Sequence, residues 1–505
     1  MVVKAAPNQQ VDLECRKATE SAVRLCEESG HHVEEVSDRP LAIVSAVSRP
    51  FSHSLRWLTQ PVNVQVAKET SIICATDQPD RNDSMECLAM KCNLPLRILT
   101  CGVCLAALAG DHSRGVGAED SYVTLGPGLA YKSLGTYSVE RLQKIVTEER
   151  QAEGFAKFDQ SYPAPKHAVK LYRVRYQSVV PEQDNRCTLA TGLIAIPDIA
   201  ARELAVVSYQ HGTTFGRTTA PSFPENSYET RLMIAQFPGH GYLLVAPDYF
   251  GKGESTEPDS YTVRDSTRQA CFDMLMASRS VCESMGIKQG PLHLTGWSQG
   301  GWCTMTFLHK LESVQVSVAA ASTASAFNDV FPSVQRWILG YQPTDAEYIP
   351  GCYTLNLFSH EFYHGLTGLT DAAIRPEYQK LAGQLYRGEI SYATFSEGTP
   401  KTVGKYLRPE FLASAARGEG RYWDILRRSE AYRWQRKTPL HSVFGQIDEA
   451  CPPYIAKLSI DYQQIARGAE GQAIDAGPKA DHRGTFLYAV AHQKTWFDTL
   501  LNRKQ

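Results

Sequence analysis

A serine flanked by glycines stands out as a residue that could do chemistry, in the stretch Gly296-Trp297-Ser298-Gln299-Gly300. An alternating apolar run, Leu292 to Thr295, precedes it, and a segment of helical character, Trp302 to Leu308, follows it. The order strand, Gly-x-Ser-x-Gly, helix is typical of a nucleophile elbow, a sharp turn that raises a serine hydroxyl above a sheet. Glycines two positions before and after the serine let the strand and the helix approach closely. We therefore take Ser298 as the candidate nucleophile.

A serine hydroxyl is a weak nucleophile at neutral pH, so it needs a neighbouring base and a third group that orients the base. The candidate base is His482, in the loop between the last expected strand and the closing helix. His492 lies within that helix, where we expect it to be packed or exposed. The candidate acid is Asp448, just after an expected strand, and its neighbour Glu449 is the competitor.

Such chemistry also needs N–H donors for the negative charge that develops on the substrate oxygen. Gln210 to Thr214 follow an apolar strand, and there the backbone N–H of Thr213 can serve. The backbone N–H of Gln299, directly after the candidate nucleophile, can supply the second donor. We favour a structural role for His211 over a catalytic one.

These residues need a scaffold, and the apolar patterns predict an α/β fold. Near-continuous apolar runs at 204–209 and 242–246 are typical of strands buried on both faces of a parallel sheet. Two alternating runs indicate an antiparallel pair, and a helical stripe covers 262–285. This alternation predicts a mostly parallel, doubly wound sheet. Further expected elements are a surface helix at 137–151 and strands at 169–176, 189–196, 314–320, 440–445 and 472–476.

The alternation stops between residues 325 and 437, which are rich in aromatic residues and helical patterns. We expect a helical cap here, inserted into a catalytic core formed by 110–324 and 438–505. The aromatic residues could surround an apolar group of the substrate, or they could simply form the cap's own core.

The segment 90–109 resembles a signal peptide, with a basic start, about a dozen apolar or small residues and an Ala-x-Ala end. We expect 1–89 to be an upstream extension or fusion segment outside the mature enzyme. The protein would then be secreted or periplasmic, and otherwise cytoplasmic. The alternative is that 90–109 forms a buried core helix.

The overall composition is that of an ordinary globular protein, with 505 residues, 43% hydrophobic residues, 21% charged residues and a formal net charge of −2. Nothing in it indicates a nucleic acid partner, and no integral membrane span is expected in the mature chain. The pair Cys101 and Cys104 resembles half of a redox or zinc site, but no second pair follows at ligand spacing. The oligomeric state and the disulfide pairing stay open.

Five motifs occur in an order that resembles the α/β-hydrolase superfamily, specifically its secreted, cap-bearing lipases and esterases. They span about residues 120 to 505 and are Tyr209-Gln210-His211-Gly212-Thr213, Asp248-Tyr249-x-Gly251-x-Gly253-x-Ser255, Gly296-Trp297-Ser298-Gln299-Gly300-Gly301, Gly445-x-x-Asp448 and His482-Arg483-Gly484-Thr485-Phe486. The resemblance implies an α/β-hydrolase fold and hydrolysis of small-molecule or lipid carboxylic esters through an acyl-enzyme. It also implies a Ser298, Asp448 and His482 triad that works without metal or organic cofactor.

A serine peptidase or amidase of the prolyl-oligopeptidase type is the alternative, because the Gly-Trp-Ser-x-Gly-Gly motif also resembles that group. Roughly ninety residues separate Gly110 from the strand at Leu204, too few for the β-propeller that the group places before its catalytic domain. The substrate stays open among short-chain esters, triglycerides, aromatic diesters and plant-wall esters.

Overall fold

The computed structural model describes residues 121–149, 155 and 158–502. These residues all belong to one unit, His112–Gln505. The expected upstream segment 1–89, the signal-peptide-like segment 90–109 and the pair Cys101 and Cys104 lie outside the described residues. No helix within the described ranges is both long enough and apolar enough to cross a bilayer.

Within the described residues, ten strands form one mixed sheet in the order β1-β2-β3-β4-β6-β5-β7-β8-β9-β10. The first four strands and the β4–β6 pair are antiparallel, and from β6 to β10 all neighbours are parallel. The predicted antiparallel pair and the mostly parallel sheet are thus confirmed. The strands are β1 (Val123–Gly126), β2 (Leu129–Tyr137), β3 (Val169–Val180), β4 (Arg186–Pro197), β5 (Glu203–Gln210), β6 (Leu243–Pro247), β7 (Lys288–Trp297), β8 (Ala320–Ala324), β9 (Leu440–Phe444) and β10 (Gly471–Asp475).

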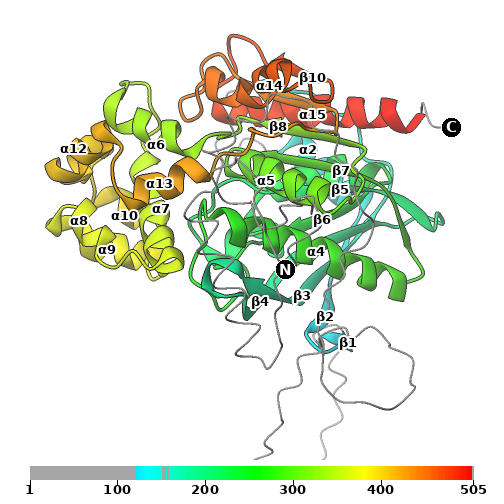
Figure 1. Ribbon diagram of the computed structural model, residues 1–505. Coiled ribbons are helices and arrows are strands. Elements are labelled where there is room, and N and C mark those ends of the chain that lie inside the picture. Colours follow the sequence, from blue (N-terminus) through cyan, green and yellow to red (C-terminus); the bar gives the residue numbers. More distant parts are fainter. Residues whose placement is uncertain (1–120, 150–154, 156–157, 503–505) are drawn as a thin grey trace, which may run out of the picture. The chain divides into compact units, whose positions relative to one another are not determined.

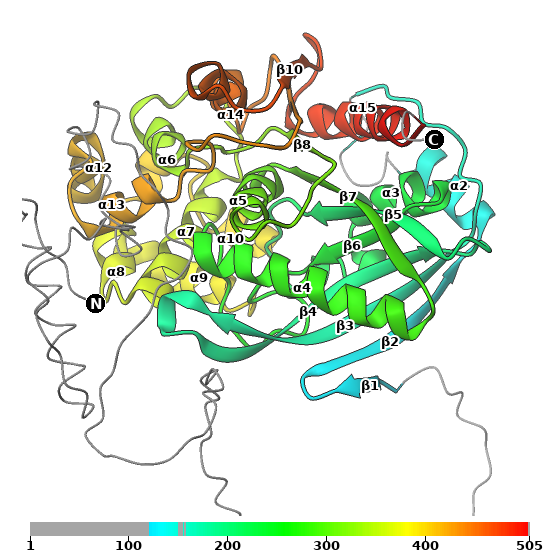
Figure 2. The same cartoon turned by 45° about the vertical axis from the view of Figure 1, so that its right-hand side comes forward.

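Helices cover both faces of the sheet. Successive residues of a strand point to opposite faces, so neighbouring residues of a central strand pack against different helices. On β5, Val206 packs into a core with α4 (Arg264–Ser284), α5 (Gln299–Ser313) and α14 (Pro453–Ala466). The next residue, Val207, packs into a second core with α2 (Val139–Thr147), α3 (Tyr228–Gln236) and α15 (His482–Asn502). Figure 2 shows α4 and α5 in front of the strands. Both faces are apolar, as the continuous hydrophobic runs predicted.

The strand expected at 314–320 is misplaced, because β8 is Ala320–Ala324. Helix α5 ends at Ser313, and Gln315 takes a left-handed conformation with φ 60°. The N–H of Val316 then bonds the Leu311 carbonyl, a closure typical of helix C-termini. The alternating valines therefore belong to the turn that follows α5. The strand itself consists of small, fully buried residues with little strand preference of their own.

Eight consecutive helices lie between β8 and β9, and Figure 1 shows them gathered at one side of the sheet. They are α6 (Val330–Leu339), α7 (Ile349–His364), α8 (Leu369–Ala373), α9 (Pro376–Tyr386), α10 (Tyr392–Glu397), α11 (Val403–Tyr406), α12 (Pro409–Arg417) and α13 (Arg421–Arg428). Tyr363, Phe395 and Tyr406 are buried and belong to the hydrophobic core that these helices share. Much of the aromatic content of this segment therefore stabilises the helices themselves.

Candidate active site

Ser298 lies at the turn between β7 and α5, with φ 59° and ψ −122°. A positive φ is rare for a residue with a side chain and marks a strained turn. The flanking glycines are needed for space. A Cβ at Gly300 would lie 1.9 Å from the carbonyl oxygen of Gln210, and one at Gly296 would lie 2.2 Å from that of Gly300. The structure thus has the elbow that the motif predicted, for the steric reason given.

Three predicted side chains form one hydrogen-bonded line. The Ser298 hydroxyl lies 2.8 Å from Nε2 of His482. On the other side of the ring, Nδ1 lies 2.9 Å from Oδ1 and 3.1 Å from Oδ2 of Asp448. Ser298 and His482 are only 5% and 3% exposed, which strengthens electrostatic interactions between the groups. In the tautomer with its proton on Nδ1, the imidazole donates to Asp448 and accepts from Ser298.

The two neighbouring carboxylates have different partners. Asp448 faces the imidazole, and its oxygens also accept hydrogen bonds from the Cys451 N–H at 2.7 Å and the Ser325 hydroxyl at 2.6 Å. Glu449 instead accepts the backbone N–H of His482 at 2.9 Å. Of the two carboxylates, Asp448 therefore contacts the imidazole and Glu449 contacts the backbone of the histidine. Ser325 was not anticipated, because no motif links it to the aspartate.

The Asp448–His482 pair shifts both pKa values toward the charged forms. Burial lowers the pKa of the His482 imidazole, but the charge and hydrogen bond of Asp448 outweigh burial and raise it above 6.5. Burial likewise raises the pKa of Asp448, but His482 and the hydrogen bonds from Cys451 and Ser325 outweigh it and keep the pKa below 3.8. The carboxylate is therefore ionised at neutral pH and stabilises a protonated imidazole.

His482 is the first residue of α15, not a loop residue as predicted. The preceding residue, Asp481, explains the early start, because its carboxylate accepts the N–H of Gly484 at 2.7 Å and its carbonyl accepts the N–H of Thr485 at 2.9 Å. These bonds close the first turn of a helix. His492, the rejected base, lies within α15 with its Nε2 2.9 Å from Nδ1 of His441.

In the loop after β5, one backbone N–H group forms a hydrogen bond with a protein side chain. The N–H of Gly212 donates to Oε1 of Glu229 at 2.7 Å. The next N–H, on Thr213, has no partner among the described residues, and neither does the N–H of Gln299 at the start of α5. The N–H groups of the two predicted oxyanion donors are therefore both without a protein partner in the described part of the chain. Glu229 was missed, because no sequence motif marks it.

His211 is held by the backbone on both sides of its ring. Nδ1 lies 2.7 Å from the carbonyl of Gly212, Nε2 lies 3.1 Å from that of Asp248, and the ring stacks on Tyr249. Burial lowers its pKa to about 4. The neutral ring can donate to only one of these carbonyls, and its burial and stacking on Tyr249 are consistent with the structural role that we favoured.

The helical segment between β8 and β9 is hydrogen-bonded to the loop that carries Asp448. The N–H of Ala346 donates to the Glu449 carbonyl at 3.0 Å, and the indole of Trp337 donates to the Ala450 carbonyl at 3.3 Å. Phe327, at the start of the cap segment, lies with its ring 6.5 Å from the His482 ring. An apolar ring from this segment therefore borders the imidazole.

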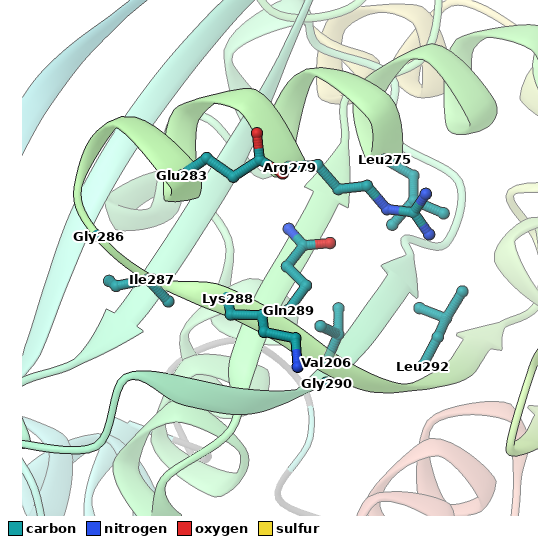
Figure 3. A pocket seen from close by; sticks show the side chains of 10 residues that line it. All are labelled: Val206, Leu275, Arg279, Glu283, Gly286, Ile287, Lys288, Gln289, Gly290 and Leu292. Atoms are coloured by element: carbon teal, nitrogen blue, oxygen red, sulfur yellow. The ribbon is translucent and has the colours of Figure 1, made fainter.

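Two cavities lie away from these side chains. One of about 440 Å³ lies between the end of α4 and the start of β7, and Figure 3 shows the Gln289 side chain pointing from the strand toward the helix that carries Arg279. It is at the opposite end of β7 from Ser298. The other, of about 580 Å³, is lined by charged residues of α4 and α13, including Arg264 and Arg428. Neither is lined by Ser298, Asp448 or His482.

No group of three or more His, Cys, Asp or Glu side chains in the described part of the chain is arranged to hold a metal ion. The six described cysteines are free thiols, namely Cys187, Cys271, Cys282, Cys303, Cys352 and Cys451. Burial raises the pKa of the Cys303 thiol, which suits a packed, protonated side chain.

The sequence matches no protein-family profile and no curated protein. Several solved structures are similar in fold. A candidate hydrolase from Legionella pneumophila has a TM-score of 0.65 at 21% identity, over 75% of this chain and 98% of that one. The rice cell wall degrading esterase LipA from Xanthomonas oryzae has a TM-score of 0.60 at 17% identity, over 77% and 98%. Lipase A from Candida antarctica in its closed state has a TM-score of 0.52 at 15% identity, over 70% and 76%.

These three similarities cover 70% to 77% of this chain at or below 21% sequence identity. In this chain the strand order, the parallel half of the sheet and the strained turn at Ser298 fit the same fold. The chain has the α/β-hydrolase fold.

Proposed function

We propose that this protein is a serine hydrolase that cleaves carboxylic esters through an acyl-enzyme, with Ser298 as nucleophile, His482 as base and Asp448 as the orienting acid. The observation that carries the proposal is the continuous line of hydrogen bonds from Ser298 Oγ through both ring nitrogens of His482 to Asp448. The esterases and lipases among the structures of similar fold support the choice of an ester as substrate.

In the proposed mechanism Ser298 Oγ attacks the ester carbonyl carbon while Nε2 of His482 takes the hydroxyl proton. The carbonyl oxygen becomes an oxyanion, which accepts hydrogen bonds from the N–H groups of Thr213 and Gln299. His482 then passes its proton to the leaving alkoxide, which departs as the alcohol and leaves an acyl-serine. Water repeats the two steps and releases the carboxylic acid. Asp448 holds the ring tautomer and stabilises the imidazolium throughout.

Initial rates on p-nitrophenyl esters from acetyl to palmitoyl, beside a chromogenic peptide, test this function. We expect ester turnover by the wild-type protein and its loss, by about 10⁴-fold or more, in Ser298→Ala. The control is Ser313→Ala, at the exposed end of α5, which should leave turnover unchanged. Cleavage of the peptide alone would favour a peptidase, and unchanged ester turnover in Ser298→Ala would overturn the proposal.

A further inference from the structure

Glu229 is a buried carboxylate that the proposed mechanism does not use. It lies in the first turn of α3 and is 8% exposed. Burial raises its pKa to about 7, although hydrogen bonds from Tyr209 and Gly212 and the charge of His482 act in the opposite direction. Burial of a carboxyl group costs free energy unless hydrogen bonds offset the loss of water. Carboxyl groups with a shifted pKa are concentrated at functional sites.

Its hydrogen bonds reach the end of β5 and the loop that follows this strand. Oε1 accepts the N–H of Gly212 at 2.7 Å and also the hydroxyl of Tyr209, near the end of the strand. The loop is further confined by Trp297, since a Cβ at Gly212 would lie 2.9 Å from Cε3 of that indole and 3.2 Å from Oε2 of Glu229. One peptide of the loop is therefore held between the carboxylate and the ring beside the nucleophile.

The fixed Gly212 restricts the next residue along the chain, Thr213. Gly212 N–H points at Glu229 and is unavailable to a substrate, whereas Thr213 N–H has no protein partner within the described residues. The Thr213 side chain is itself fixed by a hydrogen bond to the Tyr261 hydroxyl at 3.2 Å. Hydrogen bonds therefore hold both the preceding residue, Gly212, and the Thr213 side chain, which restricts the orientation of the Thr213 N–H.

We infer that Glu229 is a positioning residue for the oxyanion site, which acts by holding Gly212 so that the N–H of Thr213 faces the developing negative charge. The inference rests on the proposed function. In the proposed mechanism Glu229 contacts no reacting atom. Its effect should therefore fall on the transition state and not on binding of the ester, because the donor is used fully only when the oxyanion forms.

The test compares Glu229→Ala and Glu229→Gln with wild type on the best p-nitrophenyl ester, together with binding of an aryl trifluoromethyl ketone, which forms a tetrahedral adduct with the serine. Asp273→Asn is the matched control. Asp273 is a half-buried carboxylate on α4 that accepts hydrogen bonds from Ser178 on β3 and from Gln269 on α4. Melting temperatures establish that each variant is folded.

We expect kcat to fall by about 10²-fold in Glu229→Ala with KM within about threefold of wild type, since a small misplacement of a catalytic group has effects of that size. Affinity for the ketone should fall by the same factor as kcat/KM. Glu229→Gln keeps an acceptor oxygen and should stay within about fivefold of wild type, as should Asp273→Asn.

A kcat within threefold of wild type in Glu229→Ala would overturn the inference, and so would a glutamine variant as impaired as the alanine variant. If Glu229→Ala does not fold, Tyr209→Phe decides, because it removes one of the two donors to Oε1. It should lower kcat by about fivefold at constant KM, and an unchanged kcat would contradict the inference. Loss of turnover in Ser298→Ala tests the proposed function separately.

Discussion

The indole N–H of Trp297 donates to the backbone carbonyl of His482 at 3.1 Å, which joins the residue before the candidate nucleophile to the candidate base. The two rings also lie 5.0 Å apart. The elbow and the start of α15 come from segments 185 residues apart in sequence, so this contact helps to set the distance between Ser298 and His482.

Trp297→Phe should retain an aromatic ring but lose this hydrogen bond. The His482 carbonyl would keep its helical partner, the N–H of Phe486, and loss of the one additional hydrogen bond typically costs about 0.5 to 1.5 kcal/mol of folding free energy. We expect lower stability together with a drop in kcat of about tenfold, because the imidazole is less well oriented. Urea unfolding and ester kinetics on the same preparation measure both. Unchanged values in both experiments would show that the contact does not position His482.

Exchange of the two neighbouring carboxylates for their amides separates their roles. In Asp448→Asn the side chain can no longer favour the required tautomer of His482 or stabilise its charge, and kcat should fall by about 10⁴-fold. In Glu449→Gln an oxygen remains to accept the His482 N–H, so kcat should stay within about tenfold of wild type. Steady-state kinetics on both variants decide, and full activity in Asp448→Asn would refute the assignment of the acid.

The pH dependence of kcat/KM should follow the titration of His482, which accepts a proton only when neutral. Its pKa is raised by Asp448 above the ordinary 6.5, so activity should be lost as the pH falls through an inflection above 6.5. In Asp448→Asn the raising influence is removed while burial remains, and any residual activity should show an inflection at lower pH. A wild-type profile that is flat between pH 5 and 8 would contradict this role for His482.

The strained backbone at Ser298 predicts a gain in stability when the serine is lost to glycine. Glycine adopts φ 59°, ψ −122° without strain, whereas alanine at the same position keeps the strain. Ser298→Gly should therefore be more stable than Ser298→Ala by about 1 kcal/mol, after the larger backbone entropy of glycine in the unfolded chain is allowed for. Denaturant unfolding of the two inactive variants provides the comparison, and an alanine variant of equal or higher stability would argue against a strained turn.

The candidate site residues that a local sequence motif marks could be predicted from the sequence. The residues that reach the site only through the folded chain could not. Ser298, Asp448 and His482 follow expected strands, so their motifs could be placed without knowledge of the fold. Helix α3 escaped notice because all nine of its residues are buried, and no polar face marks its period. Glu229 lies on that helix and meets the loop after β5 only in three dimensions.

The position of strand β8 was predicted incorrectly for a different reason. Its small residues carry almost no strand signal, while the valines at 314, 316 and 318 imitate one in the turn after α5. The packing that requires small residues in β8, between β7 and β9, is visible only in the assembled sheet. The hydrophobic patterns thus predicted correctly that helices cover both faces of the sheet, but they placed this strand too early in the sequence.

The most direct test of the central claim is covalent labelling with diethyl p-nitrophenyl phosphate, followed by intact-mass and peptide mass spectrometry. We expect one diethylphosphoryl group per protein, located on Ser298, with slow labelling in His482→Ala and none in Ser298→Ala. Labelling of a different residue, or equal labelling of the wild type and Ser298→Ala, would show that Ser298 is not the nucleophile.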